Sequence, residues 1–251
     1  FNEMKGAYSS PDTVMESTVN ALLFPDTCYR YESGGDPACI PDLTYEQFLA
    51  NHKKFYHPSN ARISLVGSVD MEAALAKIDG FLKDFDREPA DFTIPMQQPV
   101  AAVARRVSYE VGAEEPLEGR TMVCCATLLG NYADTDRYFA ASVLADYLTG
   151  DNDAPLKRAI LDAGLGQDVN VNVRSDIQQS WVSWEVCNTD AEKLPEIRAT
   201  IRTVLQKLVD EGLDARRLEA CYNHFAFSQR DRDGSGFPRS LMEALTMLDS
   251  W

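Results

Sequence analysis

A strand-like run followed by a short loop and a long amphipathic helix occurs twice in this sequence. In the first copy, residues 61–66 read as a strand, and apolar residues then recur at three- and four-residue spacing as far as Phe85. The segment from Ser180 to Leu208 repeats this order. An amphipathic helix buries its apolar face best against a sheet, so the pattern predicts an α+β fold built from two similar domains.

The segment 86–103 separates the two copies. The regular spacing of apolar residues is lost in this segment, and Pro89, Pro95 and Pro99 interrupt the segment, which is typical of a linker. The sequence therefore predicts a first α+β domain at 1–85, a linker at 86–103 and a second α+β domain at 104–251.

Local signals place the elements within these domains. Strands are expected at 104–111, 121–128, 168–174 and 179–187, the last two as a hairpin, so each sheet should be antiparallel and packed with helices. Thr44 and Gln47 form a capping box that opens a helix. Helices are also expected at 13–23, after Asp70 and Asp134, at 155–163, 191–210 and beyond 214, and at 241–251.

Charge and hydropathy exclude two classes of partner. Asp and Glu outnumber Lys and Arg by 39 to 24, which argues against nucleic acid and favours basic peptides. No apolar run approaches the roughly 20 residues that cross a membrane.

Cys124 and Cys125 are adjacent in an apolar strand, and six cysteines without regular spacing indicate reduced thiols. We therefore expect a cytoplasmic protein, with a mitochondrial or plastid matrix as the alternative.

Spacing alone reveals no catalytic chemistry. His52 and His57 point to different sides of a helix, so both are expected to cap or pack, and His224 stands alone on a helix with no carboxylate at ligand spacing. The runs 151–153 and 231–234 lack the glutamate of a calcium loop and are expected to be turns.

Five spaced blocks carry a resemblance. They are FNEMKG at 1–6, LFPDT at 23–27, SGGDP at 33–37, IPDLT at 40–44 and FYHPSN at 55–60. In this order they resemble the presequence-protease branch of the pitrilysin (insulinase-like) zinc metallopeptidases. APLK at 154–157 and AGLG at 163–166 are weaker markers of that family's next domain.

The resemblance implies a zinc site that these residues complete only in part. In the family an H-x-x-E-H helix supplies two histidine ligands and the general base. That motif is absent here, so we expect no catalytic residue in this chain, and the resemblance makes Glu3 the third zinc ligand. Zinc is then a cofactor of the full-length enzyme that this chain does not hold. The fold is expected to be metallopeptidase-like or core-protein-like, with the first domain incomplete.

The implied function is part of a zinc metalloendopeptidase that degrades unfolded peptides by attack of zinc-bound water. The chain by itself is expected to be inactive. Its partners would be the peptide substrate and the remaining N-terminal and C-terminal parts of the same enzyme. The resemblance also places substrate on an edge strand at Gly166, Val169, Val171 and Val173. The same alternation of valines fits an ordinary half-buried strand. A non-catalytic structural subunit and a peptide-binding module are the alternative functions.

Overall fold

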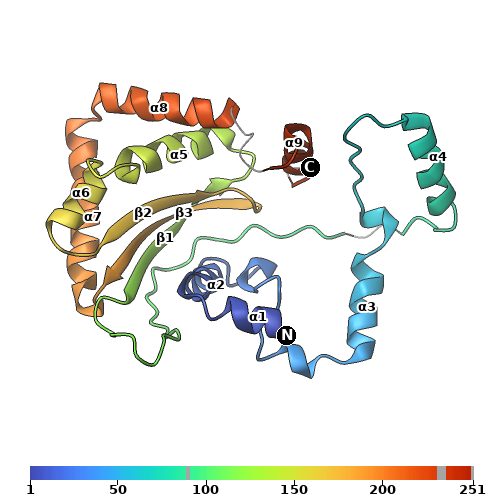
Figure 1. Ribbon diagram of the computed structural model, residues 1–251, viewed down its shortest axis with the longest axis horizontal. Helices are drawn as coiled ribbons and strands as arrows, with labels where there is room; N and C mark the ends of the chain where they lie inside the picture. The colour runs from blue at the N-terminus through green and yellow to red at the C-terminus, as the bar shows by residue number, and fades with distance from the viewer. Residues whose placement is uncertain (89–90, 231–235, 250–251) are drawn as a thin grey trace. The chain divides into compact units, whose positions relative to one another are not determined.

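The computed structural model describes residues 1–88, 91–230 and 236–249, in which α-helices accompany one antiparallel sheet of three strands (Figure 1). The predicted α+β class is confirmed. The chain divides into two compact units. We call Asn2–Gly35 with Pro95–Arg230 the sheet unit, and Phe1, Asp36–Ile94 and the described part of Asp231–Trp251 the helical unit. The predicted domain boundaries at 85 and 104 stay a prediction.

The sheet has the strand order β1-β3-β2, so β3 is central. Its strands are β1 (Thr121–Asn131), β2 (Asp168–Arg174) and β3 (Gln179–Thr189), and both pairings are antiparallel. The hairpin predicted between the last two strands is confirmed. Opposite residues share a face of the sheet, and Val169 lies opposite Val186. The register therefore assigns the paired strand residues to one of two faces.

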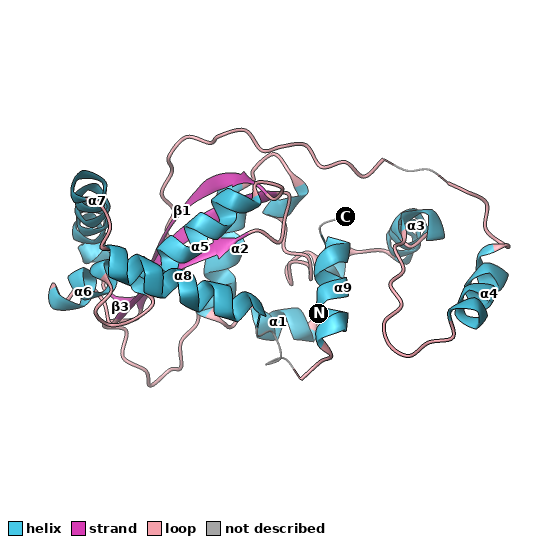
Figure 2. Cartoon of the chain, turned by 90° about the horizontal axis from the view of Figure 1, so that it is seen from above, coloured by secondary structure: helices cyan, strands magenta, loops and turns pink. Residues whose placement is uncertain are grey.

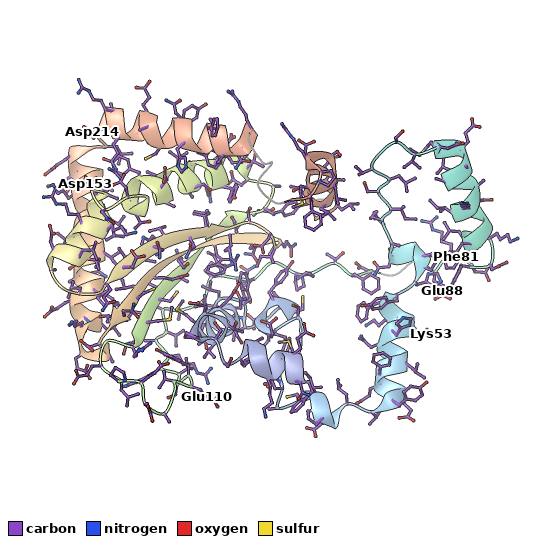
Figure 3. All side chains as sticks on the ribbon, viewed as in Figure 1. Lys53, Phe81, Glu88, Glu110, Asp153 and Asp214 are labelled. Atoms are coloured by element: carbon purple, nitrogen blue, oxygen red, sulfur yellow. The ribbon has the colours of Figure 1, made fainter. Side chains whose placement is uncertain are left out.

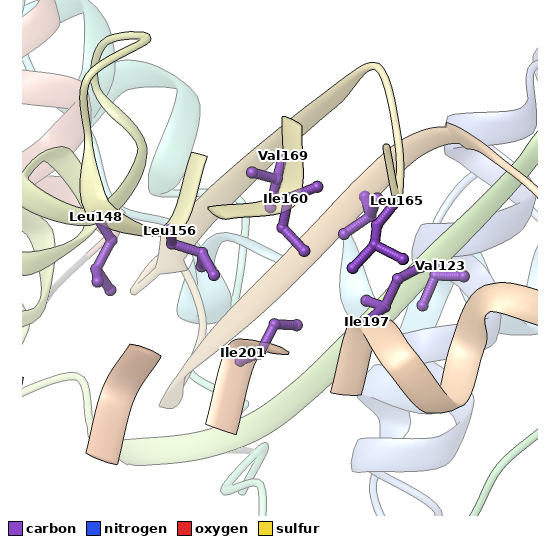
Figure 4. Close-up of a cluster of buried hydrophobic side chains, with 9 residues drawn as sticks. Val123, Leu148, Leu156, Ile160, Leu165, Val169, Ile197 and Ile201 are labelled. Carbon is purple, nitrogen blue, oxygen red and sulfur yellow. The ribbon is translucent and has the colours of Figure 1, made fainter. Parts of the chain in front are cut away.

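One face of the sheet carries the main apolar core (Figure 4). It packs against α5 (Thr135–Thr149), α6 (Pro155–Asp162) and α7 (Leu194–Glu211), and α8 (Ala215–Arg230) packs on α5. The buried side chains of this cluster are Val123, Leu148, Leu156, Ile160, Leu165, Val169, Val186, Ile197 and Ile201. Burial of these side chains is the main stabilising term of the sheet unit.

The opposite face of the sheet contacts the N-terminal segment. Here α1 (Asn2–Ala7) leads into α2 (Pro11–Leu23), which contacts β1. Leu23 and Phe24 form a second buried cluster with Trp181 of β3. Pro25 follows and cannot continue the helix, so the chain turns away at this point. Residues of the predicted first domain therefore cover the sheet of the predicted second one.

A buried amide network ties the linker segment to the same face. Gln97 is 3% exposed, and its backbone N–H donates to the Gln179 side chain at 2.6 Å, while the Gln179 amide returns a bond to the Gln97 carbonyl at 3.0 Å. The Gln97 amide also donates to Asp26 at 2.9 Å. Buried polar groups are stable only when paired, so this network fixes one path for the chain.

The helical unit begins its helices where the sequence predicted. Thr44 and Gln47 exchange the two hydrogen bonds of a capping box at the start of α3 (Tyr45–Phe55). The Asp70 carboxylate caps α4 (Met71–Leu82). Side chain to backbone bonds of this kind need only neighbouring residues, which is why they are readable from sequence.

The helices of this unit leave apolar side chains exposed. Figure 2 shows α3 and α4 as separate helices joined by a long loop, and α9 (Arg239–Asp249) is a further helix of this unit. Phe81 of α4, labelled in Figure 3, is 65% exposed, and Phe48 of α3 is 61% exposed. In the described residues these helices have no sheet of their own to cover.

Two predicted strands are wrong. Residues 61–66 and 104–111 have no strand structure. Their alternating apolar pattern suits a strand, but a strand also needs a hydrogen-bonded neighbour, and the part of the chain described here pairs none with them. The helices predicted at 13–23, 155–163 and 191–210 are confirmed within two or three residues at each end.

Candidate functional site

Strand β2 has β3 on one side and, among the described residues, no strand on the other. The N–H of Val169 is bonded to the Asp168 carboxylate at 2.8 Å, and the N–H of Val171 to the Thr149 hydroxyl at 3.1 Å. These bonds lie on the side away from β3. Because the register of β2 is unbroken, the N–H of Val173 points to the same open side.

The predicted substrate-binding valines have a structural role as well. Val169 is fully buried in the main core and Val171 packs against it. The prediction of a half-buried strand is therefore confirmed. The part of these valines in substrate binding stays a prediction.

A cavity of about 470 Å³ runs along this open edge. It lies between α2 on one side of the sheet and α5 on the other, an arrangement that can be followed in Figure 1. We call it the β2 slot. Its walls are Asp12, Met15, Glu16 and Val19 of α2, Ser142 and Ala145 of α5, residues 171–174 of β2, and Cys124, Trp181 and Glu185 of the sheet.

The charges in the β2 slot are unbalanced. Arg174 forms an ion pair with Glu16. Glu185 accepts a hydrogen bond from the Ser183 hydroxyl at 2.6 Å. Within residues 1–88, 91–230 and 236–249, neither Glu185 nor Asp12 forms an ion pair. The slot thus presents carboxylate oxygens that no neighbouring cation neutralises.

The thiol in the slot is unreactive. Burial, with smaller contributions from the Glu185 carboxylate and Cys125, raises the pKa of Cys124 to about 12. A thiol is nucleophilic only as the thiolate, so Cys124 stays protonated at neutral pH and cannot act as a nucleophile. The slot can bind a ligand, but its own side chains offer no activated nucleophile.

Gly166, the fourth predicted substrate-binding residue, lies just before β2. A Cβ at this position would lie 2.4 Å from Val186 Cγ1 and 3.1 Å from the Cys187 carbonyl oxygen. The valine is β-branched and the carbonyl is backbone, so neither moves easily. The close approach of two strands explains the glycine without any substrate.

We expect Gly166→Ala to lower the free energy of unfolding by about 1–3 kcal/mol, the usual cost of overpacking. Urea denaturation followed by circular dichroism would measure it. Gly6→Ala is the matched control, because a Cβ there meets no atom within 4 Å. A Gly166→Ala variant as stable as the Gly6→Ala variant would show that the strands at Gly166 separate freely.

Glu3, the predicted zinc ligand, is an exposed residue in the first turn of α1. Among the residues that the structure describes, no three His, Cys, Asp or Glu side chains lie together as a metal site. The described residues therefore do not fit a zinc ion by themselves, and Glu3 offers one ligand at most.

The histidines have structural partners. His52 stacks on Tyr56, and His57 accepts the Ser59 N–H at 3.2 Å, so the capping and packing roles predicted for these two are confirmed. His224 lies 3.1 Å from the Asp146 carboxylate, a contact that the sequence did not reveal. The two residues lie on different helices, and no local spacing signals their pairing.

The predicted turn at 151–153 is confirmed. The Asp151 carboxylate accepts the Asp153 N–H at 2.8 Å and the Arg217 guanidinium at 2.9 Å. The hydrogen bond from Arg217 is the main cause that holds the pKa of Asp151 below its usual value. The second predicted turn, at 231–234, lies outside the described residues. No helix in the described ranges is long and apolar enough to cross a bilayer.

Comparison with known proteins gives a consistent family match. The family described as "Peptidase M16 inactive domain" matches residues 42–224. Protein HypA of Clostridium perfringens is 37% identical over the whole chain, which covers 26% of that protein. Presequence protease 1, chloroplastic/mitochondrial, of Arabidopsis thaliana is 32% identical, with 24% of it covered. The chain thus spans about a quarter of the length of these relatives.

Solved structures share the fold. The crystal structure of a peptidase M16 inactive domain from Pseudomonas fluorescens superposes with a TM-score of 0.65 at 20% identity, covering 88% of this chain and 52% of that one. A protease from Helicobacter pylori gives a TM-score of 0.62 at 16% identity, covering 92% and 55% of the two chains. At these identities the likeness establishes the fold alone.

Proposed function

Because this chain belongs to the peptidase M16 family and matches its inactive domain, we propose that it is a non-catalytic part of a longer peptidase that binds extended peptides along β2. The observation that carries the proposal is the β2 slot. An open strand edge with a cavity beside it is the geometry that accepts an added strand, because main-chain hydrogen bonds then bind any extended peptide.

The pairing is proposed to centre on Val173. The N–H groups of Val169 and Val171 already have acceptors in Asp168 and Thr149. A peptide that paired with them would have to displace these acceptors. Val173 borders the slot and directs its N–H to the same side, so a peptide carbonyl can accept this N–H without displacing another acceptor.

In the longer protein, the proposal includes zinc-dependent cleavage of the bound peptide. Glu3 is proposed to supply one zinc ligand there, beside histidines outside this chain. The peptide and the other parts of the same enzyme are the proposed partners. The proposed compartment is the cytoplasm. The alternative is an organelle matrix, because relatives of this chain carry the names of mitochondrial and chloroplast proteins.

We expect Val173→Pro to weaken binding of an N-acetylated, extended peptide at least tenfold, because proline removes the N–H that pairs with the added strand. Fluorescence anisotropy of the labelled peptide would measure the change with the full 251-residue chain. Val173→Ala keeps the N–H and is the matched control. Circular dichroism would confirm that both variants fold.

A second variant tests the slot without touching β2. Ser142 lies on the α5 wall, so Ser142→Trp should fill the space and also block the peptide. Wild-type affinity in both Val173→Pro and Ser142→Trp would place the peptide elsewhere and remove the proposal.

A further inference from the structure

We propose that the β2 slot selects peptides carrying a lysine or arginine side chain, an inference that rests on the peptide binding proposed above. The walls of the slot hold the carboxylates of Asp12, Glu16 and Glu185 and one cation, Arg174. Arg174 already forms an ion pair with Glu16. The carboxylates of Asp12 and Glu185 are therefore the ones left for a ligand.

These two carboxylates come from different elements that line the slot. Asp12 lies in the first turn of α2, and Glu185 lies on the strand β3 that forms the floor. Glu185 is half-buried, so water screens its charge less than that of a fully exposed group. A cation between them would be attracted by both.

The sheet register directs one face of an added strand toward these groups. Glu185 lies opposite Asn170, and Asn172 is on the same face two residues along β2. A peptide residue paired beside Asn172 would project from that face too. The Cα of Glu185 then lies two strand spacings across the sheet and two residues along it, roughly 12 Å away, within the combined reach of a glutamate and a lysine or arginine side chain.

The remaining walls suit the stem of such a side chain. Met15 and Val19 of α2 and Trp181 of the sheet are apolar and line the same cavity. Lysine and arginine have long methylene stems that pack on apolar surface while the charged end reaches polar groups. The slot thus offers apolar contacts along its length and carboxylates at the charged end.

The test compares two peptides that differ at one residue. Both are N-acetylated, extended and labelled with an uncharged dye, and the central residue is either lysine or norleucine. Acetylation removes the terminal amine, so any preference must come from the side chain. We expect the full chain to bind the lysine peptide about tenfold more tightly at low salt, with the preference falling as salt rises.

Charge-neutral variants locate the effect. Asp12→Asn combined with Glu185→Gln should abolish the lysine preference, and glutamine can still accept the Ser183 bond. Arg174→Gln should increase the preference, because it releases Glu16. Glu219→Gln, an exposed carboxylate change on α8, should leave the preference unchanged.

The outcomes separate this inference from the function on which it rests. Equal binding of both peptides by the wild type, with Val173→Pro still weakening both, would overturn the cation site and keep the strand pairing. A lysine preference that persists in the Asp12→Asn, Glu185→Gln variant would also overturn it. Binding of neither peptide would overturn both proposals.

Discussion

Replacing Phe24 with alanine is expected to lower the free energy of unfolding of the sheet unit by about 3–5 kcal/mol, the range for truncating a buried aromatic side chain. Phe24 is fully buried, and its ring meets Tyr29 edge to face at 5.6 Å. It shares a cluster with Trp181, which lies in a distant part of the sequence. The aromatic ring therefore joins the N-terminal segment to the sheet.

The same change should also weaken peptide binding. Phe24 directly follows α2, which is one wall of the β2 slot, so loss of its packing frees that wall to move away from the sheet. Urea denaturation would give the stability, and anisotropy below the unfolding transition would give the affinity. Tyr31→Ala is the control, because Tyr31 is 72% exposed and should cost less than about 1 kcal/mol. Wild-type stability in Phe24→Ala would show that α2 is held by other contacts.

The elements that could be predicted from sequence depend on neighbouring residues. The start of α3 follows from Thr44 and Gln47, whose hydrogen bonds span three residues. The bounds of β2 at 168 and 174 follow from alternating valines and a turn after Arg174. In both cases the interaction that forms the element and the pattern that signals it lie in the same short segment.

The errors concern contacts between distant segments. Residues 61–66 and 104–111 have strand composition, yet pairing depends on a neighbouring strand that composition cannot supply. The packing of Phe24 on Trp181 and the bonds between Gln97 and Gln179 are equally non-local. A single sequence gives no sign of which distant residues will meet.

In the candidate site, too, local features could be predicted from the sequence and non-local ones could not. The strand at 168–174 follows from the alternation of Val169, Val171 and Val173, which is local, whereas its position at an edge was implied only by the family resemblance. The walls of the slot were not predicted, since α2 and α5 reach β2 only in the folded chain. Two of the predicted residues also have packing reasons of their own: Gly166 avoids Val186, and Val169 fills the core. A position can thus match a functional pattern for structural reasons.

For the longer zinc enzyme proposed above, Glu3→Gln is expected to lower zinc affinity at least about a hundredfold, because Glu3 is proposed there as a direct ligand and loss of a direct ligand exceeds the loss of a supporting residue. Zinc content after dialysis, with peptide cleavage measured beside it, would test this. Glu46→Gln, a change of an exposed carboxylate in the first turn of α3, is the matched control and should keep its metal. Full zinc occupancy in Glu3→Gln would remove Glu3 from the metal site. It would leave the β2 slot untouched, because strand pairing at Val173 needs no metal.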